Sequence, residues 1–311
     1  MKLSIVTTLY KSAPYVNEFY KRVSSSAQAL THQDYEIVLV NDGSPDNCLE
    51  LATSLADADA HVVVVDLSRN FGHHKAMMTG LAYAQGEKVF LIDSDLEESP
   101  EWVIEFDKQL ISEKADVVYG VQRRRKGSLT ERYTGALFYK IFRFLSGLDL
   151  PENIVVARLM SRRYVNALLG HRESEIFMAG LWLLTGFKQV PQIVDKLSRA
   201  STTYTFRKKV SQLVNSVTSF SSKPLVGIFL IGLCIFGFAS LYSIYLVVNW
   251  FFLSVPPSGY TSMMASIWLL GGLVSASVGV VGIYLSKIYS ETKQRPYTIV
   301  RQVYKKAGER P

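Results

Sequence analysis

The chain has 311 residues, of which 48% are hydrophobic, and a formal net charge of +7. This length and composition fit one large or two small domains with an ordinary core. The charge is uneven, because residues 196–223 carry +6 and residues 287–311 carry +5, which leaves −4 for residues 1–195. The basic stretches flank an uncharged apolar segment, so they indicate a membrane edge and exclude a nucleic-acid-binding surface.

The first 122 residues alternate between predicted strands and predicted helices. Runs of β-branched residues predict the strands, and apolar residues at helical spacing predict the helices. The strands are 3–9, 35–40, 61–67, 88–92 and 116–121, and the helices are 14–30, 46–57, 75–85 (ended by Gly86) and 100–113. Near-continuous apolar strands alternating with helices predict an α/β fold with a parallel sheet covered on both faces.

Residues 123–223 give a weaker pattern. A basic loop opens at Arg123, and helices are predicted over 133–145 and 174–185. Residues 207–220 have apolar side chains on one face and three basic residues at the start, which is typical of a helix lying in a membrane interface.

Residues 224–286 contain no Asp, Glu, Lys, Arg or His. Because a membrane-spanning helix takes roughly 20 apolar residues, the runs Leu225–Leu253 and Met263–Leu285 predict two transmembrane helices joined by a turn. The basic flanks place both termini in the cytoplasm. The N-terminus lacks a signal-peptide pattern, and Cys48 and Cys234 are predicted to be free thiols.

Asp93-Ser94-Asp95 follows the fourth predicted strand. In sheets of this kind, ligands bind beyond the carboxyl ends of the strands. Two carboxylates this close can hold a divalent cation together with diphosphate oxygens, and the cation then neutralises charge on a departing diphosphate. Such a triplet is commonly only a loop or a helix cap, so its position after a strand carries the prediction.

Other polar segments are predicted at the same edge. Asp42, in Asn41-Asp42-Gly43-Ser44, could accept from a base or a ribose, although this sequence is also a good turn. Cations at this edge would suit a protein that joins two phosphate-bearing substrates, with a solvated or membrane-surface patch as the alternative. These cations are Arg123, Arg124, Arg125, Lys126 and Arg132.

Five segments together resemble the GT-A, family 2 polyprenyl-phosphate glycosyltransferases, which include dolichol-phosphate mannose synthase and the bactoprenol glucosyl transferases. The segments are Asn41–Ser44, Leu67–His73, Asp93–Leu96, Arg158–Arg162 and Ser219–Leu225. The resemblance implies a Rossmann-like, nucleotide-diphospho-sugar transferase domain over 1–200, an amphipathic juxtamembrane helix over 201–223, a transmembrane hairpin over 224–286 and a basic cytoplasmic tail over 287–311.

The resemblance also implies the activity and the site. We expect inverting transfer of one sugar from a UDP-sugar or GDP-sugar, with UDP favoured, to undecaprenyl phosphate, with Mg²⁺ or Mn²⁺ as cofactor. The expected setting is the bacterial inner membrane, with the catalytic domain cytoplasmic, a homo-oligomer as a possible state, and lipopolysaccharide or O-antigen synthesis as the role. The expected catalytic residues are Asp93, Asp95, Arg124, Arg125 and Arg132; the metal ligands are Asp95 and Glu97; the donor-binding residues are Thr8, Tyr10, Asp42, Ser68, Arg69, Asn70, His73, Lys75, Asp93 and Ser94.

Three positions depart from the family pattern. Residues 8–12 replace a Pro-x-Tyr-Asn-Glu segment, Glu97 replaces a frequent Gln, and Val156-Ala157 replaces a frequent Asp-Phe pair. An acid at position 156 therefore takes no part in catalysis. A phosphate monoester, with a second pKa of about 6, needs no general base to attack at pH 7.

Other functions are less consistent with the sequence. A processive polysaccharide synthase would show a Gln-x-x-Arg-Trp motif, and none of the four Trp residues follows an Arg. A nucleotidyltransferase would open with a glycine-rich loop, whereas the first glycine is Gly43. A non-catalytic membrane scaffold would have no reason to keep Asp42, Asp93 and Asp95 at strand ends.

Overall fold

The computed structural model describes residues 1–122, 140, 143–145, 151, 153–173, 176–197, 214, 217–218, 221–253 and 259–306. The chain divides into two compact units. One unit holds the sheet and comprises Met1–Tyr139, Asp149–Tyr204 and Arg295–Pro311. The other comprises Lys140–Leu148 and Thr205–Gln294 and holds two long helices.

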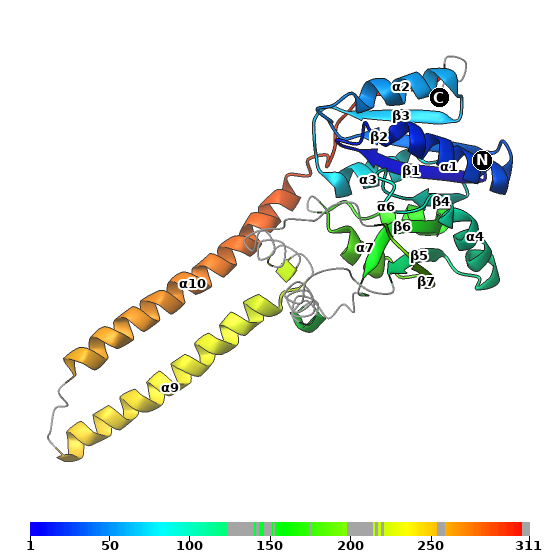
Figure 1. The fold of residues 1–311 in the computed structure, drawn as a ribbon. Coiled ribbons are helices and arrows are strands. Elements are labelled where there is room, and N and C mark those ends of the chain that lie inside the picture. The colour runs from blue at the N-terminus through cyan, green and yellow to red at the C-terminus, as the bar shows by residue number, and fades with distance from the viewer. Residues whose placement is uncertain are drawn as a thin grey trace. The chain divides into compact units, whose positions relative to one another are not determined.

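The first unit is built on an eight-stranded mixed sheet (Figure 1). The strand order is β7-β5-β6-β4-β1-β2-β3-β8. The strands are β1 (Leu3–Leu9), β2 (Tyr35–Asn41), β3 (Val62–Leu67), β4 (Lys88–Leu91), β5 (Val117–Gln122), β6 (Ile154–Ser161), β7 (Gln189–Val194) and β8 (Val300–Tyr304). Strands β1, β2 and β3 are buried along their whole length, which explains their unbroken apolar runs.

Helices cover both faces of this sheet. On one face α1 packs against α2 and α4, and on the other α3 contacts β1, β2 and α6. The helices of this unit are α1 (Val16–Thr31), α2 (Cys48–Ala58), α3 (His73–Tyr83), α4 (Trp102–Ser112), α6 (Arg162–Leu169) and α7 (Met178–Leu184). Helix α3 approaches the sheet closely at Gly80, where a Cβ would lie 2.5 Å from a side-chain carbon of Val6.

The predicted parallel sheet is instead a mixed sheet, because β6 and β8 run antiparallel to their neighbours. The predicted fifth strand, β5, does not pair with β4, because the antiparallel strand β6 lies between them. Strand β6 was not predicted, because the buried Arg158 interrupts its apolar residues and its sequence lacks a clean alternation. The α/β class itself is confirmed.

Two predicted helices also need correction. Helix α3 starts at His73 and not at Lys75, and it ends at Tyr83, so Gly86 does not cap it. Instead, Gly86 N–H donates to Ser4 Oγ over 2.6 Å. The helix predicted over 174–185 is shorter, as α7 spans Met178–Leu184.

The second unit contains α9 (Lys223–Leu253) and α10 (Tyr260–Thr292). Tyr284 of α10 donates a 2.6 Å hydrogen bond to the carbonyl of Ser221, just before α9. Within the described residues, one helical stretch, Leu269–Thr292, is long and apolar enough to cross a membrane, and a shorter apolar stretch covers Lys223–Ala239. Both cysteines are free, as predicted.

Candidate functional site

The candidate site lies where the carboxyl ends of the strands meet. Strands β1 to β4 are parallel. Strand β5 runs in the same direction, because both β4 and β5 pair antiparallel with β6, and β7 pairs parallel with β5. The segments that follow β1, β2, β3, β4 and β7 therefore reach one edge of the sheet. This edge brings together Thr8, Asp42, His73, Asp93 and Lys196.

Asp42 holds the loop that follows β3. Its carboxylate is 2% exposed and accepts hydrogen bonds from the N–H groups of Phe71 (2.7 Å) and Gly72 (3.1 Å). Burial raises the pKa of Asp42, against the lowering effect of these two N–H groups. At Gly43 (φ 58°) a Cβ would lie 2.4 Å from Asn70 N, so the two loops touch backbone to backbone. Asp42 thus builds the site, and its contact with a base or ribose stays a prediction.

Thr8, His73 and Asp93 form a chain of contacts across the edge. Thr8 Oγ1 lies 2.9 Å from Nδ1 of His73, whose Nε2 lies 3.3 Å from Oδ1 of Asp93. Burial lowers the pKa of His73, but Asp93 and then Asp42 outweigh it, so the net pKa is raised. This favours an imidazolium beside Asp93. The sequence predicted all three residues at the site, although it did not predict their mutual contact.

Asp95 stands beside Asp93 on a strained turn. Asp95 Oδ1 accepts from Glu97 N–H over 2.9 Å, and burial raises the pKa of Asp95. Leu96, between Asp95 and Glu97, has a positive φ of 59°, which is unusual for a residue of this size, and its side chain is buried. The turn at Leu96 therefore keeps the Asp95 carboxylate against the backbone of Glu97.

The two aspartates fit a divalent cation better than Glu97 does. Asp93 Oδ1 is buried and makes no well-aligned hydrogen bond. In contrast, Glu97 Oε2 lies 3.3 Å from the ammonium of Lys196. Within the described residues no group of three His, Cys, Asp or Glu side chains is arranged to hold a metal. Two carboxylates suffice for Mg²⁺ when substrate phosphates and water supply its other ligands.

Lys196 and Glu98 lie beside Asp93 and Asp95, and the sequence analysis did not single them out. Glu98 is fully buried and accepts from the N–H groups of Val156 (3.1 Å) and Ala157 (2.8 Å). Its Oε1 lies 3.5 Å from Lys196 Nζ. Burial, followed by the charge of Asp93, raises the pKa of Glu98. Burial opposes the charge of Lys196, but Glu98, Asp93, Asp95 and Glu97 outweigh it and raise the lysine's pKa.

The other expected donor-binding residues take mixed positions. Ser94 is buried, and its Oγ lies 2.9 Å from the Thr8 carbonyl, so it supports β1. Tyr10 is exposed, and Lys75 lies in the first turn of α3. The Arg69 guanidinium lies 4.1 Å over the Phe71 ring and donates to the Asn70 carbonyl. These surface residues remain candidates for ligand contact.

Strand β8 and the residue before it bind the loop that follows β3. Ser68 N–H donates to the Ile299 carbonyl (2.9 Å), and Arg301 Nη2 donates to the Ser68 carbonyl (2.7 Å). Arg301 Nη1 also lies 3.4 Å from Oδ2 of Asp66, a 1%-exposed carboxylate that accepts from Asn41 Nδ2 over 2.8 Å. The chain after α10 therefore supports the loops that carry Asp42 and Ser68. The tail had been predicted only as basic.

Several predictions concern residues outside the described part of the chain. They are Arg123, Arg124, Arg125, Lys126, Arg132, most of the helices predicted over 133–145 and 207–220, and the turn at 254–258.

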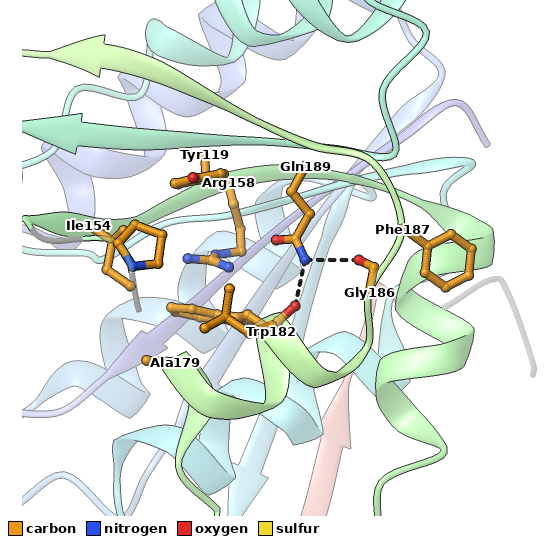
Figure 2. A pocket seen from close by; sticks show the side chains of 10 residues that line it. Tyr119, Ile154, Arg158, Ala179, Trp182, Gly186, Phe187 and Gln189 are labelled. Atoms are coloured by element: carbon orange, nitrogen blue, oxygen red, sulfur yellow. Dashed lines mark hydrogen bonds between the residues drawn. The ribbon is translucent and has the colours of Figure 1, made fainter. Parts of the chain in front are cut away.

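Two adjoining pockets lie between the sheet and α7. The first, of about 290 Å³, contains Arg158 on β6, which is 1% exposed and stacks on the Trp182 ring (Figure 2). Gln189 Nε2 donates to the carbonyls of Trp182 (2.6 Å) and Gly186 (2.9 Å), which fixes the end of α7. Burial lowers the pKa of Arg158 to about 9.

The second pocket, of about 230 Å³, lies beside Glu98 and Lys196. It shares Trp182 with the first pocket and is also lined by Lys196, Glu98 and Val156. Burial lowers the pKa of His74, another lining residue, so this imidazole is neutral near pH 7. The pocket combines an aromatic wall with polar and apolar groups, as binding sites for small organic molecules do.

Residues 4–169 match the family model described as glycosyl transferase family 2. The chain is 51% identical over 304 residues to a protein of Mycobacterium tuberculosis named as a glycosyltransferase, covering 98% of this chain and 89% of that protein. It is 32% identical over 312 residues to the prophage bactoprenol glucosyl transferase homolog of Escherichia coli, covering 98% of this chain and all of that protein. Among solved structures, glucosyl-3-phosphoglycerate synthase of M. tuberculosis with UDP is similar at 20% identity and a TM-score of 0.48, covering 70% of this chain and 79% of that one.

Proposed function

This chain belongs to glycosyl transferase family 2, and from that premise we propose that it transfers a single sugar from a nucleotide-diphosphate sugar to a polyprenyl phosphate. The chain is a glycosyltransferase, so the open questions are its donor and acceptor. The acceptor is proposed because relatives that align over nearly the whole chain are named bactoprenol glucosyl transferases. We propose a UDP-sugar as donor and undecaprenyl phosphate as acceptor.

The reaction we propose is an in-line displacement. A phosphate oxygen of the acceptor forms a bond to the anomeric carbon while the bond from that carbon to the diphosphate oxygen breaks. The products are the polyprenyl phosphate sugar, with inverted configuration, and the nucleoside diphosphate. The nucleophile is already ionised at pH 7, so the valine at position 156 is compatible with turnover.

The observation that carries the proposal is the charge arrangement at the ends of β4 and β7. Asp93 and Asp95 lie together there, with the His73 imidazole 3.3 Å from Asp93. These two carboxylates would hold Mg²⁺ or Mn²⁺, which would supply charge stabilisation for the departing diphosphate. The His73 imidazole lies beside Asp93, and Asp95 stands on the turn at Leu96. We propose that the loop held by Asp42 contacts the donor.

We also propose that α9 and α10 anchor the enzyme in the bacterial inner membrane, with the sheet domain on the cytoplasmic face. The support is the uncharged segment 224–286 with basic flanks of +6 and +5. A lipid-linked acceptor keeps its phosphate in the headgroup layer, and such an anchor would hold the enzyme at that layer. Arg124, Arg125 and Arg132 remain proposed acceptor contacts, and synthesis or modification of a cell-surface glycan such as O-antigen is the proposed role.

A transfer assay tests this function. Purified full-length protein in detergent is given each common UDP-sugar or GDP-sugar with undecaprenyl phosphate, in Mg²⁺, Mn²⁺ or EDTA. We expect one labelled sugar on the lipid with a UDP-sugar, and no product in EDTA. Repeated addition of sugar to one acceptor would point to a processive synthase. No binding of UDP with Mn²⁺ and no transfer from any donor would favour a membrane scaffold.

A further inference from the structure

We propose that Lys196 is a phosphate-binding residue of this site. When a substrate binds, the lysine leaves its glutamate partners and contacts a phosphate oxygen of that substrate. The proposal rests on the proposed function, because it needs a phosphate-bearing substrate at the strand ends.

The backbone fixes Lys196 at the site. It stands two residues after β7, and the next residue, Leu197, donates its N–H to the Glu97 carbonyl over 2.9 Å. This bond ties the end of β7 to the turn that carries Asp95. The lysine therefore has a defined position beside Asp95, although its side chain comes from a distant part of the sequence.

The contacts of the ammonium group leave it able to exchange partners. Nζ lies 3.3 Å from Glu97 Oε2 and 3.5 Å from Glu98 Oε1, which are ion-pair distances longer than a charged hydrogen bond of about 2.8 Å. A lysine has three donors on a flexible stem, so it can reach another anion with little backbone movement. Its side chain is 22% exposed, on the wall of the second pocket.

The surrounding charge requires such a cation. Asp93, Asp95, Glu97 and Glu98 all act on Lys196, so an incoming phosphate would meet four carboxylates. Among the described residues that line this pocket, Lys196 is the only Lys or Arg. Glu98 keeps its two backbone N–H donors when the lysine moves, so its buried carboxylate still has hydrogen-bond partners. The shared ligand chemistry is a phosphate oxygen, from either the donor diphosphate or the acceptor monophosphate.

The test compares Lys196→Met, Lys196→Arg and a matched control, Lys188→Met, in full-length protein in detergent. Lys188 precedes the other end of β7, and its Nζ lies 3.5 Å from Glu113 Oε2. The equilibrium dissociation constants of UDP, in EDTA and in Mn²⁺, and of a short-chain prenyl phosphate are measured with the melting temperature. If Lys196→Met does not fold, the variant with both Lys196→Met and Glu98→Gln replaces it, because it neutralises the buried carboxylate that loses its cation.

We expect Lys196→Met to raise the dissociation constant of one of the two ligands by about tenfold or more, as loss of a charged hydrogen bond predicts. Lys196→Arg should restore binding to within about threefold, and Lys188→Met should leave it unchanged. Weaker UDP binding in EDTA assigns the donor diphosphate, and weaker prenyl phosphate binding assigns the acceptor. The proposal is overturned if wild type binds a ligand and Lys196→Met binds both ligands as wild type does. If wild type itself binds neither ligand, the proposed function fails as well.

Discussion

The carboxylate of Asp42 accepts a 2.7 Å hydrogen bond from the backbone of Phe71, so the loop after β2 carries the loop after β3. We predict that Asp42→Asn loosens the loop at 69–72, because an amide has one acceptor oxygen where the loop offers two N–H donors. A buried N–H without a partner costs about 1–3 kcal/mol. Amide hydrogen exchange at Phe71 and Gly72 should speed up, and UDP should bind more weakly. Unchanged exchange at both amides would contradict this role.

Asp95→Asn should abolish sugar transfer while the fold is retained. The substitution removes a carboxylate from the edge of the site and no apolar core contact, and the loss of charge weakens cation binding. Transfer is measured with saturating donor, and the melting temperature reports the fold. Asp57→Asn, at an exposed position on α2, is the matched control. Activity of Asp95→Asn within about threefold of wild type would rule out the metal assignment.

Arg301→Ala should destabilise the sheet domain although it lies far along the chain from the loops it holds. It leaves the Asp66 carboxylate buried without its cation and the Ser68 carbonyl without its side-chain donor. Because the Arg301 side chain is 57% exposed, we expect the free energy of unfolding to fall by about 1–2 kcal/mol, which is less than for a fully buried pair. Chemical denaturation measures it, with Lys305→Ala as control. Equal stability of the two variants would mean that β8 needs no arginine.

The Arg22–Glu101 pair should make stability depend on pH in the acid range. A hydrogen bond from Arg22 lowers the pKa of Glu101 from 4.5 to about 2. A lowered carboxyl pKa adds stability above pH 4.5, which is lost as the pH falls toward 2. Both side chains are partly exposed, so the contribution is at most about 1 kcal/mol. Glu101→Gln should be less stable than wild type at pH 7 and equal to it near pH 2. A difference that persists at pH 2 would show another cause.

Ser258→Cys should be labelled from outside intact cells, as the proposed membrane hairpin requires. The background is Cys234→Ser, which removes the cysteine of α9, while Cys48 is buried in the sheet domain. An impermeant thiol reagent is applied to whole cells and to lysed cells. A cysteine at Lys305 should react only after lysis. The reverse pattern would invert the proposed topology.

The sequence predicted the elements whose patterns are local. Strands β1 to β4 are buried apolar runs, and α1 has buried residues at helical spacing, so both periodicities are visible in the chain. Strand β6 carries a charged residue, Arg158, in its buried part, and β8 has no buried residue. Both strands pair with distant partners, and that pairing has no local signal. The site follows the same division. Asp93 and Asp95 were proposed from a motif after a strand, whereas Lys196 comes beside them only through the parallel pairing of β5 and β7.

Strand β8 also sets the order in which this protein can be completed. The ribosome releases β3 early, then the two long apolar helices, and β8 last, yet β8 covers the edge of β3. Until synthesis passes α10, the nascent sheet therefore exposes an unpaired edge strand, which is a site for aberrant pairing between chains. Expression of residues 1–200 alone would leave that edge open permanently. A version of the domain without the two long helices should instead join residues 1–200 to 295–306 through a flexible linker.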